Sequence, residues 1–422
     1  MESVGKNPSD DECTPSWLDK DFIGRALKND DPTIDASSVE LISVQTAGGG
    51  YLSETLRVVA RSTGGSGAAR ETSLFVKAAL KPTGVARDVT AFGVYDKEAI
   101  AYSHFLPSLH SALNKVEGRK FQPLAPKLYL QGSEPLVFMV LEDLSATGFR
   151  PWPQGDNLDL AASTAAIRAV ARMHAASVCL LSHERYSTKV FHQSLVFNEF
   201  VLQCLDTDEA TFKEDLQVLD ENPWFRKYTD KLRASARVLL QTPVLRVKYC
   251  AVDFKVMLHG DLHKSNMMFR TDEDGLQVRL YDFQGLHVGS PAEDLQYFLH
   301  SSASLEVLQH HTDLLLSEYH STLQRTLRAL GLQQQADTYP LEQLRRDMDH
   351  FGTVAVITAF KILPFLLRTD DMGLPLDSQS ENFKEQMEKF RRISYRNEKY
   401  LRYLECLLPV FDSKGYFESQ ST

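Results

Sequence analysis

The chain has 422 residues, of which 43% are hydrophobic and 24% charged, a balance typical of a globular protein with a large core. Its net charge of −10 argues against binding to nucleic acid or to an anionic membrane, because such binding needs a basic face. The five cysteines lack the short spacings of a zinc site or a disulfide framework. They favour a reducing compartment, so we expect a cytoplasmic protein.

Residues 1–38 are expected to form an N-terminal segment that is partly disordered, because about the first 15 are polar and acidic. No apolar run of the signal-peptide kind occurs there. The longest apolar stretch lies elsewhere, at 351–367. It is interrupted by Lys361 and Pro364 and is shorter than the ~20 residues of a membrane-spanning helix. It is therefore predicted to be a buried helix, and no membrane partner is expected.

Short β-type runs dominate residues 39–144. A glycine-rich connection at 62–70 and the flanking residues indicate hairpins, and one helix is expected at about 89–105. The predicted strands cover residues 39–46, 54–61, 72–78, 127–131 and 136–142. Together they predict a small antiparallel sheet accompanied by one helix.

Residues 145–422 are predicted to be mainly helical. Helices are expected at about 158–177, 191–218, 223–241, 291–331, 340–367 and 380–407. One β-hairpin is predicted among them, with strands at 267–270 and 278–281 around an acidic turn that ends in Gly275. The expected fold class is therefore α+β and bilobal, with an antiparallel-sheet N-lobe and a larger, mainly helical C-lobe.

Two motifs in the C-lobe carry the chemistry. The first is His259-Gly260-Asp261 followed by Asn266, and the second begins at Asp282. Phosphoryl transfer from ATP needs a base for the attacking hydroxyl and oxygen ligands for Mg²⁺. Asp261 is the predicted base, and Asn266 and Asp282 are the predicted metal ligands. The hairpin between the two motifs would bring these three residues together.

The same residues permit less specific interpretations. His259, Asp261 and His263 resemble part of a metallohydrolase site, but no further ligand follows at a recognisable spacing. Asp282-Phe283 taken alone carries no information, since an acid before an aromatic residue is common at strand ends. The order and spacing of the two motifs together favour phosphotransfer.

A glycine-rich loop is the candidate for covering the triphosphate. Gly48, Gly49 and Gly50 lie between two predicted strands, and Ser53 follows them. Glycines let backbone N–H groups approach phosphate oxygens closely. The segment lacks the Lys and Ser or Thr of a Walker A loop. A plain hairpin is the alternative interpretation.

Lys77, at the end of a predicted strand, is the expected contact of the α- and β-phosphates. An exposed lysine on an edge strand is the alternative. Glu98, on the helix that follows, is expected to pair with Lys77, although an isolated helical glutamate is usually solvated. The residues expected to bind adenine through their backbone are Leu141, Glu142, Asp143 and Leu144. They end a predicted buried strand at the hinge.

Four further polar residues are assigned secondary roles. His174 is expected to be a hydrogen-bonded core histidine. Asp294 is expected to interact with a helix N-terminus or to brace the catalytic loop. His263 and Lys264, next to the base, are candidates for contact with the phosphoryl group, and solvent exposure is the alternative for Lys264.

With these residues in place, the chain resembles the ecdysteroid kinase-like (CHK kinase-like) family of insects, which is related to aminoglycoside phosphotransferases and choline kinases. The resemblance covers most of residues 39–365 and rests on the motifs around Lys77, Glu98, Glu142, Asp261 and Asp282. It implies a protein-kinase-like fold, ATP and Mg²⁺ as cofactors, and a small-molecule hydroxyl as acceptor. His263 stands where this family often has tryptophan, which weakens the substrate assignment.

The resemblance favours an ecdysteroid or a xenobiotic alcohol as acceptor. Choline or an aminoglycoside is the rival within the enzyme class, and a catalytically silent ligand-binding protein is the rival outside it. All four key residues for activity are present: Lys77, Asp261, Asn266 and Asp282. The candidate walls of an apolar acceptor pocket, which are alternatively plain core, are Phe351, Val354, Phe360 and Phe365.

Overall fold

The computed structural model describes residues 15–49, 53–65, 67–79, 93–181, 183, 186, 191, 194, 209–249, 253–369 and 382–418. The chain divides into two compact units. The first unit consists of residues 1–82 and 126–149, and the second of residues 83–125 and 150–422.

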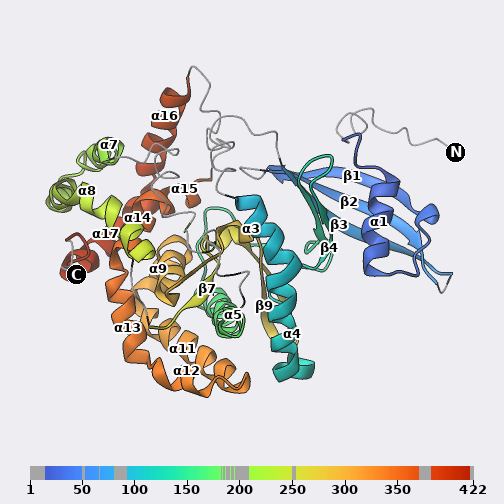
Figure 1. The fold of residues 1–422 in the computed structure, drawn as a ribbon. Helices are drawn as coiled ribbons and strands as arrows, with labels where there is room; N and C mark the ends of the chain where they lie inside the picture. Colours follow the sequence, from blue (N-terminus) through green and yellow to red (C-terminus); the bar gives the residue numbers. More distant parts are fainter. Residues whose placement is uncertain are drawn as a thin grey trace. The chain divides into compact units, whose positions relative to one another are not determined.

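The first unit is built on a five-stranded antiparallel sheet (Figure 1). Its strands run in the order β1-β2-β3-β5-β4 and confirm the five predicted strands. Their bounds are β1 Glu40–Gly49, β2 Ser53–Thr63, β3 Ala69–Ala79, β4 Leu128–Gly132 and β5 Phe138–Glu142. Alternate residues of β3 point to opposite faces, so Leu74, Val76 and Ala78 are buried on one face while Lys77 lies on the other.

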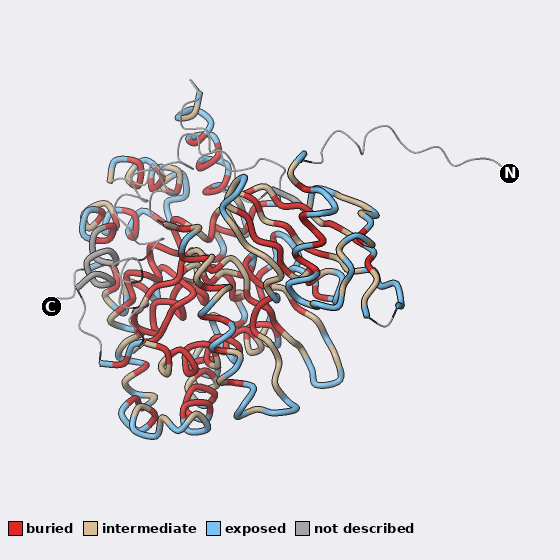
Figure 2. Tube along the Cα trace, turned by 45° about the vertical axis from the view of Figure 1, so that its right-hand side comes forward, coloured by how far each residue is buried: buried red, intermediate tan, exposed pale blue. Residues whose placement is uncertain are grey.

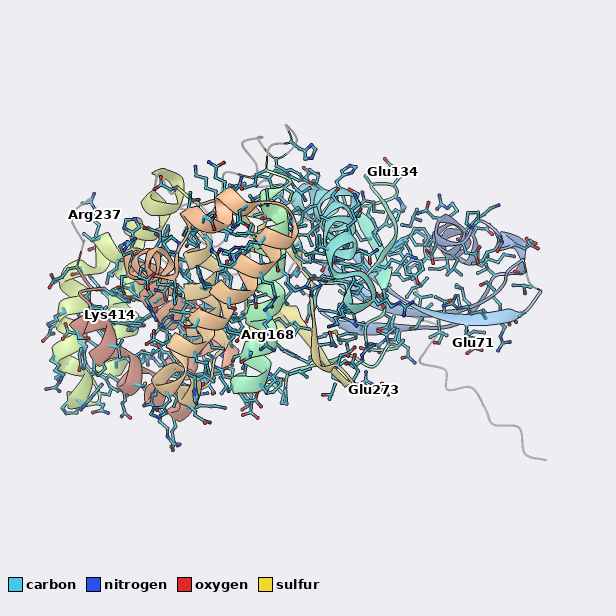
Figure 3. The ribbon with its side chains drawn as sticks, turned by 90° about the horizontal axis from the view of Figure 1, so that it is seen from below. Glu71, Glu134, Arg168, Arg237, Glu273 and Lys414 are labelled. Atoms are coloured by element: carbon cyan, nitrogen blue, oxygen red, sulfur yellow. The ribbon has the colours of Figure 1, made fainter. Side chains whose placement is uncertain are left out.

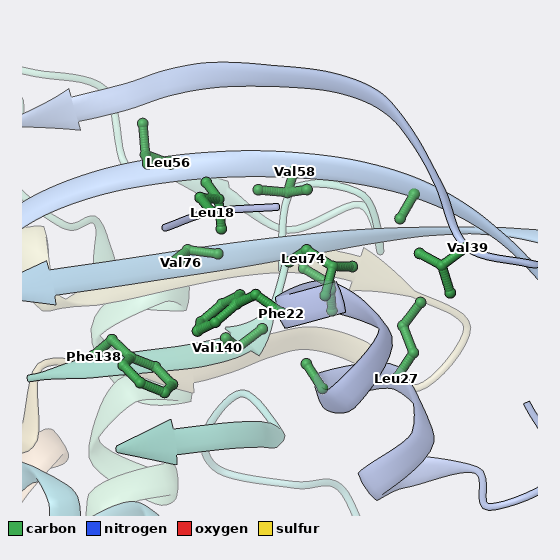
Figure 4. Close-up of a cluster of buried hydrophobic side chains, with 13 residues drawn as sticks. Leu18, Phe22, Leu27, Val39, Leu56, Val58, Leu74, Val76, Phe138 and Val140 are labelled. Carbon is green, nitrogen blue, oxygen red and sulfur yellow. The ribbon is translucent and has the colours of Figure 1, made fainter. Parts of the chain in front are cut away.

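Helix α1 (Lys20–Asp30) was not predicted from the sequence. Asp19 caps its N-terminus, since the Asp19 side chain accepts a hydrogen bond from the backbone N–H of Phe22. The apolar face of α1 packs on the sheet, and Figure 4 shows Phe22 near Leu74 and Val140, and Leu27 near Val39. The rings of Phe22 and Phe138 meet edge to face at 4.8 Å. Residues 18–27 of the expected N-terminal segment therefore contribute to the core of this unit.

Helices make up most of the second unit, as predicted. Among the described residues they are α3 (Val94–Ile100), α4 (Leu106–Glu117), α5 (Leu160–Val178), α7 (Glu209–Leu219), α8 (Arg226–Tyr249), α9 (Pro291–Ser302), α10 (Leu305–His310), α11 (Thr312–Ala329), α12 (Gln333–Thr338), α13 (Leu341–His350), α14 (Gly352–Lys361), α15 (Leu363–Leu366), α16 (Phe383–Tyr395) and α17 (Glu398–Ser413). α5 packs beside α11, and α14 beside α9 (Figure 1).

Three long helices predicted from sequence are each divided in the structure. The segment 291–331 breaks at Ala303, where Ser304 caps α10. The segment 340–367 breaks before Gly352 and again before Pro364. The segment 380–407 breaks at Asn397, whose side chain accepts two backbone N–H groups at the start of α17. Periodicity alone missed these breaks because the apolar pattern continues across them.

Two other predicted helices differ in extent. The helix expected to end at 105 continues through a π-helical turn, Ala101–Phe105, into α4. Pro107 does not end the helix, because it occupies the first turn of α4, where proline is tolerated. Residues 89–92, and most of the expected helix over 191–208, lie outside the described residues. None of the helices described is long and apolar enough to span a membrane.

Short strands of the second unit carry the motif region. The predicted hairpin is confirmed as β8 (Met267–Asp272) and β9 (Gly275–Leu280), with Glu273 at its exposed tip (Figure 3). β6 (Arg150–Pro151) pairs with β8. β7 (Val256–Leu258) and β10 (His287–Gly289) form a separate antiparallel pair that the sequence did not predict. All of β7 and nearly all of α9 are buried, and Figure 2 draws the buried residues of the chain in red.

Candidate active site

The loop that follows β7 is packed against the loop that follows β9. Gly260 has φ +77°, and a Cβ atom there would lie 2.0 Å from the carbonyl oxygen of Gly285. A Cβ on Gly285 would in turn meet the backbone of His259 and Gly260 at 2.9 Å. Only glycine allows the two backbones to come this close. The two motifs that were predicted to meet are therefore in contact within the second unit.

His259 joins the two loops through its side chain. Its Nε2 lies 3.0 Å from the backbone oxygen of Tyr281, so this nitrogen carries the proton and donates. Its ring also packs on Phe283, at 4.8 Å between centroids. Burial lowers the pKa of His259 and keeps the imidazole neutral. His259 thus has a structural role, in contrast to the ligand role of the metallohydrolase interpretation.

Asp294 braces the backbone that leads to Asp261. Its Oδ2 accepts from the N–H of His259 at 2.8 Å, and its Oδ1 accepts from the N–H of Gly260 at 3.0 Å. Its third partner is Nε2 of His174, at 3.1 Å from Oδ2. The other nitrogen of His174 lies 2.8 Å from the hydroxyl of Tyr319. This agrees with the bracing role expected of Asp294 and with the expectation that His174 is a core residue.

We expect Asp294→Ala to destabilise the protein by about 3–5 kcal/mol, because it leaves two buried N–H groups without an acceptor. Burial raises the pKa of Asp294, but the interactions with His174 and His259 and the hydrogen bond from the Gly260 N–H together outweigh it, so the net pKa is below the ordinary 3.8. The stabilisation is therefore present above that pH and is lost as the pH falls further.

Urea unfolding at pH 7 and in acid measures both effects of this substitution. Asp313→Ala is a suitable control, since that side chain is 86% exposed, and it should change the free energy of unfolding by less than about 0.5 kcal/mol. A cost for Asp294→Ala as small as that of the control would contradict the brace.

Asn266 faces Asp261 within the same loop. Its amide nitrogen lies 2.9 Å from the backbone oxygen of Asp261 and 3.3 Å from its Oδ2. With the nitrogen directed at these acceptors, the amide oxygen is on the opposite side and remains available as a ligand. The carboxylate of Asp261 is 16% exposed, so it remains accessible.

Asp282 has the only left-handed backbone of any non-glycine residue in the described part of the chain, with φ 65° and ψ 58°. Such a conformation is costly and persists where the surrounding structure enforces it, often at functional sites. The 3₁₀ turn Phe283–Gly285 follows, and the amide of Gln284 lies 3.4 Å from Oδ2 of Asp282.

Helix α3 and the π-helical turn after it pack against this 3₁₀ turn, where Tyr102 meets Phe283 edge to face at 5.8 Å. Glu98 on α3 is only 1% exposed, which excludes the alternative that Glu98 is a solvated helical glutamate. Burial, followed by the charges of Glu98 and Asp282, raises the pKa of Tyr102. Glu98 and Asp282 thus share this part of the second unit.

Lys264 is neither exposed to solvent nor free to contact a phosphoryl group, which were the two alternatives from the sequence. It is 4% exposed, and its ammonium donates to the backbone oxygen of Asp156 at 2.5 Å and to Oδ1 of Asn157 at 2.7 Å. Burial lowers its pKa to about 8. The ammonium therefore links the loop that contains Asp261 to residues 156–157, in contrast to the expected contact with a phosphoryl group. His263 lies beside Asp261, with its Nε2 3.4 Å from Oδ1 of the carboxylate.

The residues predicted to hold the nucleotide lie in the first unit, except for Glu98. Gly48 and Gly49 end β1 and Ser53 begins β2, whereas Gly50 lies outside the described residues. Lys77 is on β3, between β2 and β5, which excludes the edge-strand alternative. Whether Lys77 pairs with Glu98 stays a prediction.

In the predicted hinge segment, the side chain of Asp143 accepts three hydrogen bonds. The Oδ2 of Asp143 accepts from Arg57 Nε and from the hydroxyl of Ser73, both at 2.7 Å. Its Oδ1 accepts from the N–H of Ser145 at 3.0 Å. Asp143 thus shapes the chain where it leaves β5. The adjacent Leu141 and Leu144 are buried, and Glu142 pairs with Leu74 of β3. The binding of adenine by this segment stays a prediction.

One residue of the site was missed from sequence. Tyr297 on α9 donates its hydroxyl to Oδ1 of Asp261 at 2.8 Å. The available signal was its position three residues after Asp294, which places both on one face of a helix. By contrast, the proposed pocket walls Phe351, Val354 and Phe360 are at most 1% exposed and belong to the core, and Phe365 is partly buried.

Comparison with solved structures finds similarity to phosphotransferases at low sequence identity. A candidate aminoglycoside phosphotransferase from Ralstonia eutropha JMP134 has 12% identity and a TM-score of 0.40, covering 90% of this chain and 97% of that one. A thermostable mutant of aminoglycoside phosphotransferase APH(4)-Ia has 16% identity and a TM-score of 0.28, covering 79% and 98%. No curated protein matches the sequence.

The family comparison covers most of the chain described above. The model of the Ecdysteroid kinase-like family matches residues 47–332, which is more than half of the sequence and includes both motifs. The antiparallel sheet and the helical remainder form the α+β, kinase-like fold predicted from the sequence. The chain therefore belongs to the ecdysteroid kinase-like family.

Proposed function

We propose that the protein is a cytoplasmic, ATP-dependent phosphotransferase that phosphorylates a hydroxyl group of a small molecule. The observation that supports this most directly is the packing of the Gly260 and Gly285 backbones, which joins the loop of Asp261 and Asn266 to that of Asp282. Membership of the ecdysteroid kinase-like family supports the same reaction class.

In the proposed reaction Asp261 is the base. It takes the proton of the acceptor hydroxyl as that oxygen bonds to the γ-phosphorus of ATP. The bond from phosphorus to the β–γ bridging oxygen breaks, which releases ADP. The proposed product is a phosphate monoester. The partial exposure of the Asp261 carboxylate is compatible with this proton transfer.

Asn266 and Asp282 are the proposed ligands of Mg²⁺, which when bound neutralises charge on the transferred phosphoryl group. The residues fit this ion, because Mg²⁺ prefers oxygen ligands and the amide nitrogen of Asn266 is already directed at Asp261. Among the described residues, no three His, Cys, Asp or Glu side chains form a cluster that could hold a metal ion without the amide of Asn266 or the nucleotide.

For the nucleotide, we propose contacts from Gly48, Gly49, Gly50 and Ser53, from Lys77, and from the backbone of residues 141–144. Lys77→Ala is expected to weaken ATP binding about tenfold, since a phosphate contact is a charge-assisted interaction. Titration calorimetry with MgATP measures this affinity. Lys127→Ala is a matched control, because Lys127 is an exposed lysine of the same unit that pairs with Asp30.

An unchanged affinity in Lys77→Ala would contradict the phosphate contact. Glu98→Ala tests the predicted pair. If Glu98 orients Lys77, the double variant loses clearly less affinity than the sum of the two single losses. Strict additivity would indicate that the two residues act separately.

We propose an ecdysteroid or a similar apolar alcohol as the acceptor, with xenobiotic alcohols as the nearest alternative. The description of the family supports this choice. The net charge of −10 gives no support to a nucleic-acid partner. Choline and aminoglycosides remain alternatives within the enzyme class, and catalytic silence is the alternative outside it.

The test is an ADP-release assay of the purified full chain with MgATP and a panel of ecdysteroids, plant alcohols, choline and aminoglycosides. Mass spectrometry should then find one added phosphoryl group on the preferred acceptor. Choline or aminoglycoside turnover without any apolar product would overturn the acceptor but not the kinase. MgATP binding without phosphorylation of any acceptor would favour the silent relative.

A further inference from the structure

The hydroxyl of Tyr297 is bonded to the side chain of the proposed base. It donates to Oδ1 of Asp261 at 2.8 Å, and Tyr297 is only 3% exposed. Burial, followed by the charge of Asp261, raises the pKa of this phenol well above its ordinary value. The hydroxyl therefore keeps its proton and acts as a permanent donor to the carboxylate.

Each oxygen of the Asp261 carboxylate has a neighbour that restrains it. Tyr297 holds Oδ1, and the amide nitrogen of Asn266 is 3.3 Å from Oδ2. His263 Nε2 lies 3.4 Å from Oδ1, a longer contact. The carboxylate is thus fixed in rotation about its Cβ–Cγ bond. A base with a fixed lone-pair direction loses less entropy when it meets the acceptor hydroxyl.

Helix α9, which carries Tyr297, is itself held in place at its N-terminus. It begins with a capping box in which Ser290 and Glu293 satisfy each other's backbone N–H groups. One turn before Tyr297 the same helix carries Asp294, which binds the N–H groups of His259 and Gly260. A single helix therefore holds both the backbone before Asp261 and its carboxylate.

We propose that Tyr297 is a positioning residue for the phosphotransfer step, acting through the orientation of Asp261. This inference rests on the proposed function. Other buried tyrosines of the unit donate to backbone oxygens or to other carboxylates, as Tyr395 does to the backbone of Phe360 at 2.6 Å and Tyr339 to Oδ2 of Asp347 at 2.7 Å. The bond of Tyr297 differs in its acceptor, which is the partly exposed carboxylate of the proposed base.

Tyr297→Phe removes only the hydroxyl and is compared with Tyr339→Phe. Tyr339 is also buried and donates to a carboxylate, Asp347 Oδ2, at 2.7 Å, away from the loop of Asp261. The two substitutions remove the same type of bond. We expect Tyr297→Phe to lower kcat about tenfold with the KM for ATP unchanged, and Tyr339→Phe to leave both parameters within about twofold.

The same pair of substitutions in an Asp261→Asn background separates orientation from general destabilisation. There the loss caused by Tyr297→Phe should shrink below about twofold, because the base that it orients is absent. Thermal unfolding of each variant checks that the folded fraction is equal. If Tyr297→Phe is not folded at the assay temperature, both phenylalanine variants are compared at a lower temperature at which thermal unfolding shows them to be folded.

The outcomes distinguish this inference from the function on which it rests. A turnover of Tyr297→Phe equal to wild type, or an equal loss in both backgrounds, would overturn the positioning role and leave the kinase in place. A wild-type protein that phosphorylates no acceptor would overturn the proposed function together with this role.

Discussion

Asp261→Asn is expected to lower kcat about 10²–10⁴-fold, which is the usual contribution of a positioned general base. Asparagine has nearly the same shape but cannot take the hydroxyl proton. Its side-chain oxygen can still accept from Tyr297, so the loop should keep its conformation. The KM for ATP should therefore change little. Single-turnover measurements with saturating MgATP check the chemical step directly.

Asp274→Asn is the matched control for this substitution. Asp274 is an exposed acid in the β8–β9 turn of the same unit, so the change of charge is identical while the site is untouched. Its kcat should stay within about twofold of wild type. Full turnover by Asp261→Asn would end the assignment of Asp261 as the base.

The elements that sequence predicted well are those whose pattern is local. Alternation in β3 buries Leu74, Val76 and Ala78 while Lys77 takes the other face, and the acidic turn at 272–275 closes the hairpin. α1 was not predicted, because about the first 15 residues are polar and the residues after them were assigned to the same partly disordered segment. Its face, with Phe22 and Leu27, is stabilised by the sheet, which no local pattern reveals.

The candidate site could be described from the sequence only to the level of residue types and spacing, and the roles of its residues stay predictions. Asp261, Asn266 and Asp282 could be named because their order along the chain reflects a chemical requirement. The partners of these residues could not. The contact of Tyr297 with Asp261 depends on how α9 packs against the loop, and no local pattern indicates the left-handed backbone of Asp282. Lys264 likewise finds its acceptors more than 100 residues away in sequence.

Asp282→Asn is expected to lower kcat at least about 10³-fold, and by more than Asp261→Asn does in the same assay. The phosphotransfer transition state gains little from covalent help and depends on neutralising charge at the phosphates. Asparagine tolerates the left-handed backbone of Asp282 about as well as aspartate, so stability should change little. The substitution thus removes the negative ligand and leaves the local conformation in place.

Asp282→Ala tests both the contribution of the carboxylate to activity and the contribution of the side chain to the left-handed backbone conformation. Alanine adopts φ 65° poorly, at a cost of about 1–2 kcal/mol, so this variant should lose stability as well as activity. Asn266→Ala should lose activity too, with a higher Mg²⁺ concentration needed for half-maximal rate. Activity measured against Mg²⁺ concentration, together with urea unfolding, resolves these effects. If Asp282→Asn and Asn266→Ala kept the Mg²⁺ dependence of wild type, neither residue would be a metal ligand, because removal of a ligand must weaken the binding of the ion it holds.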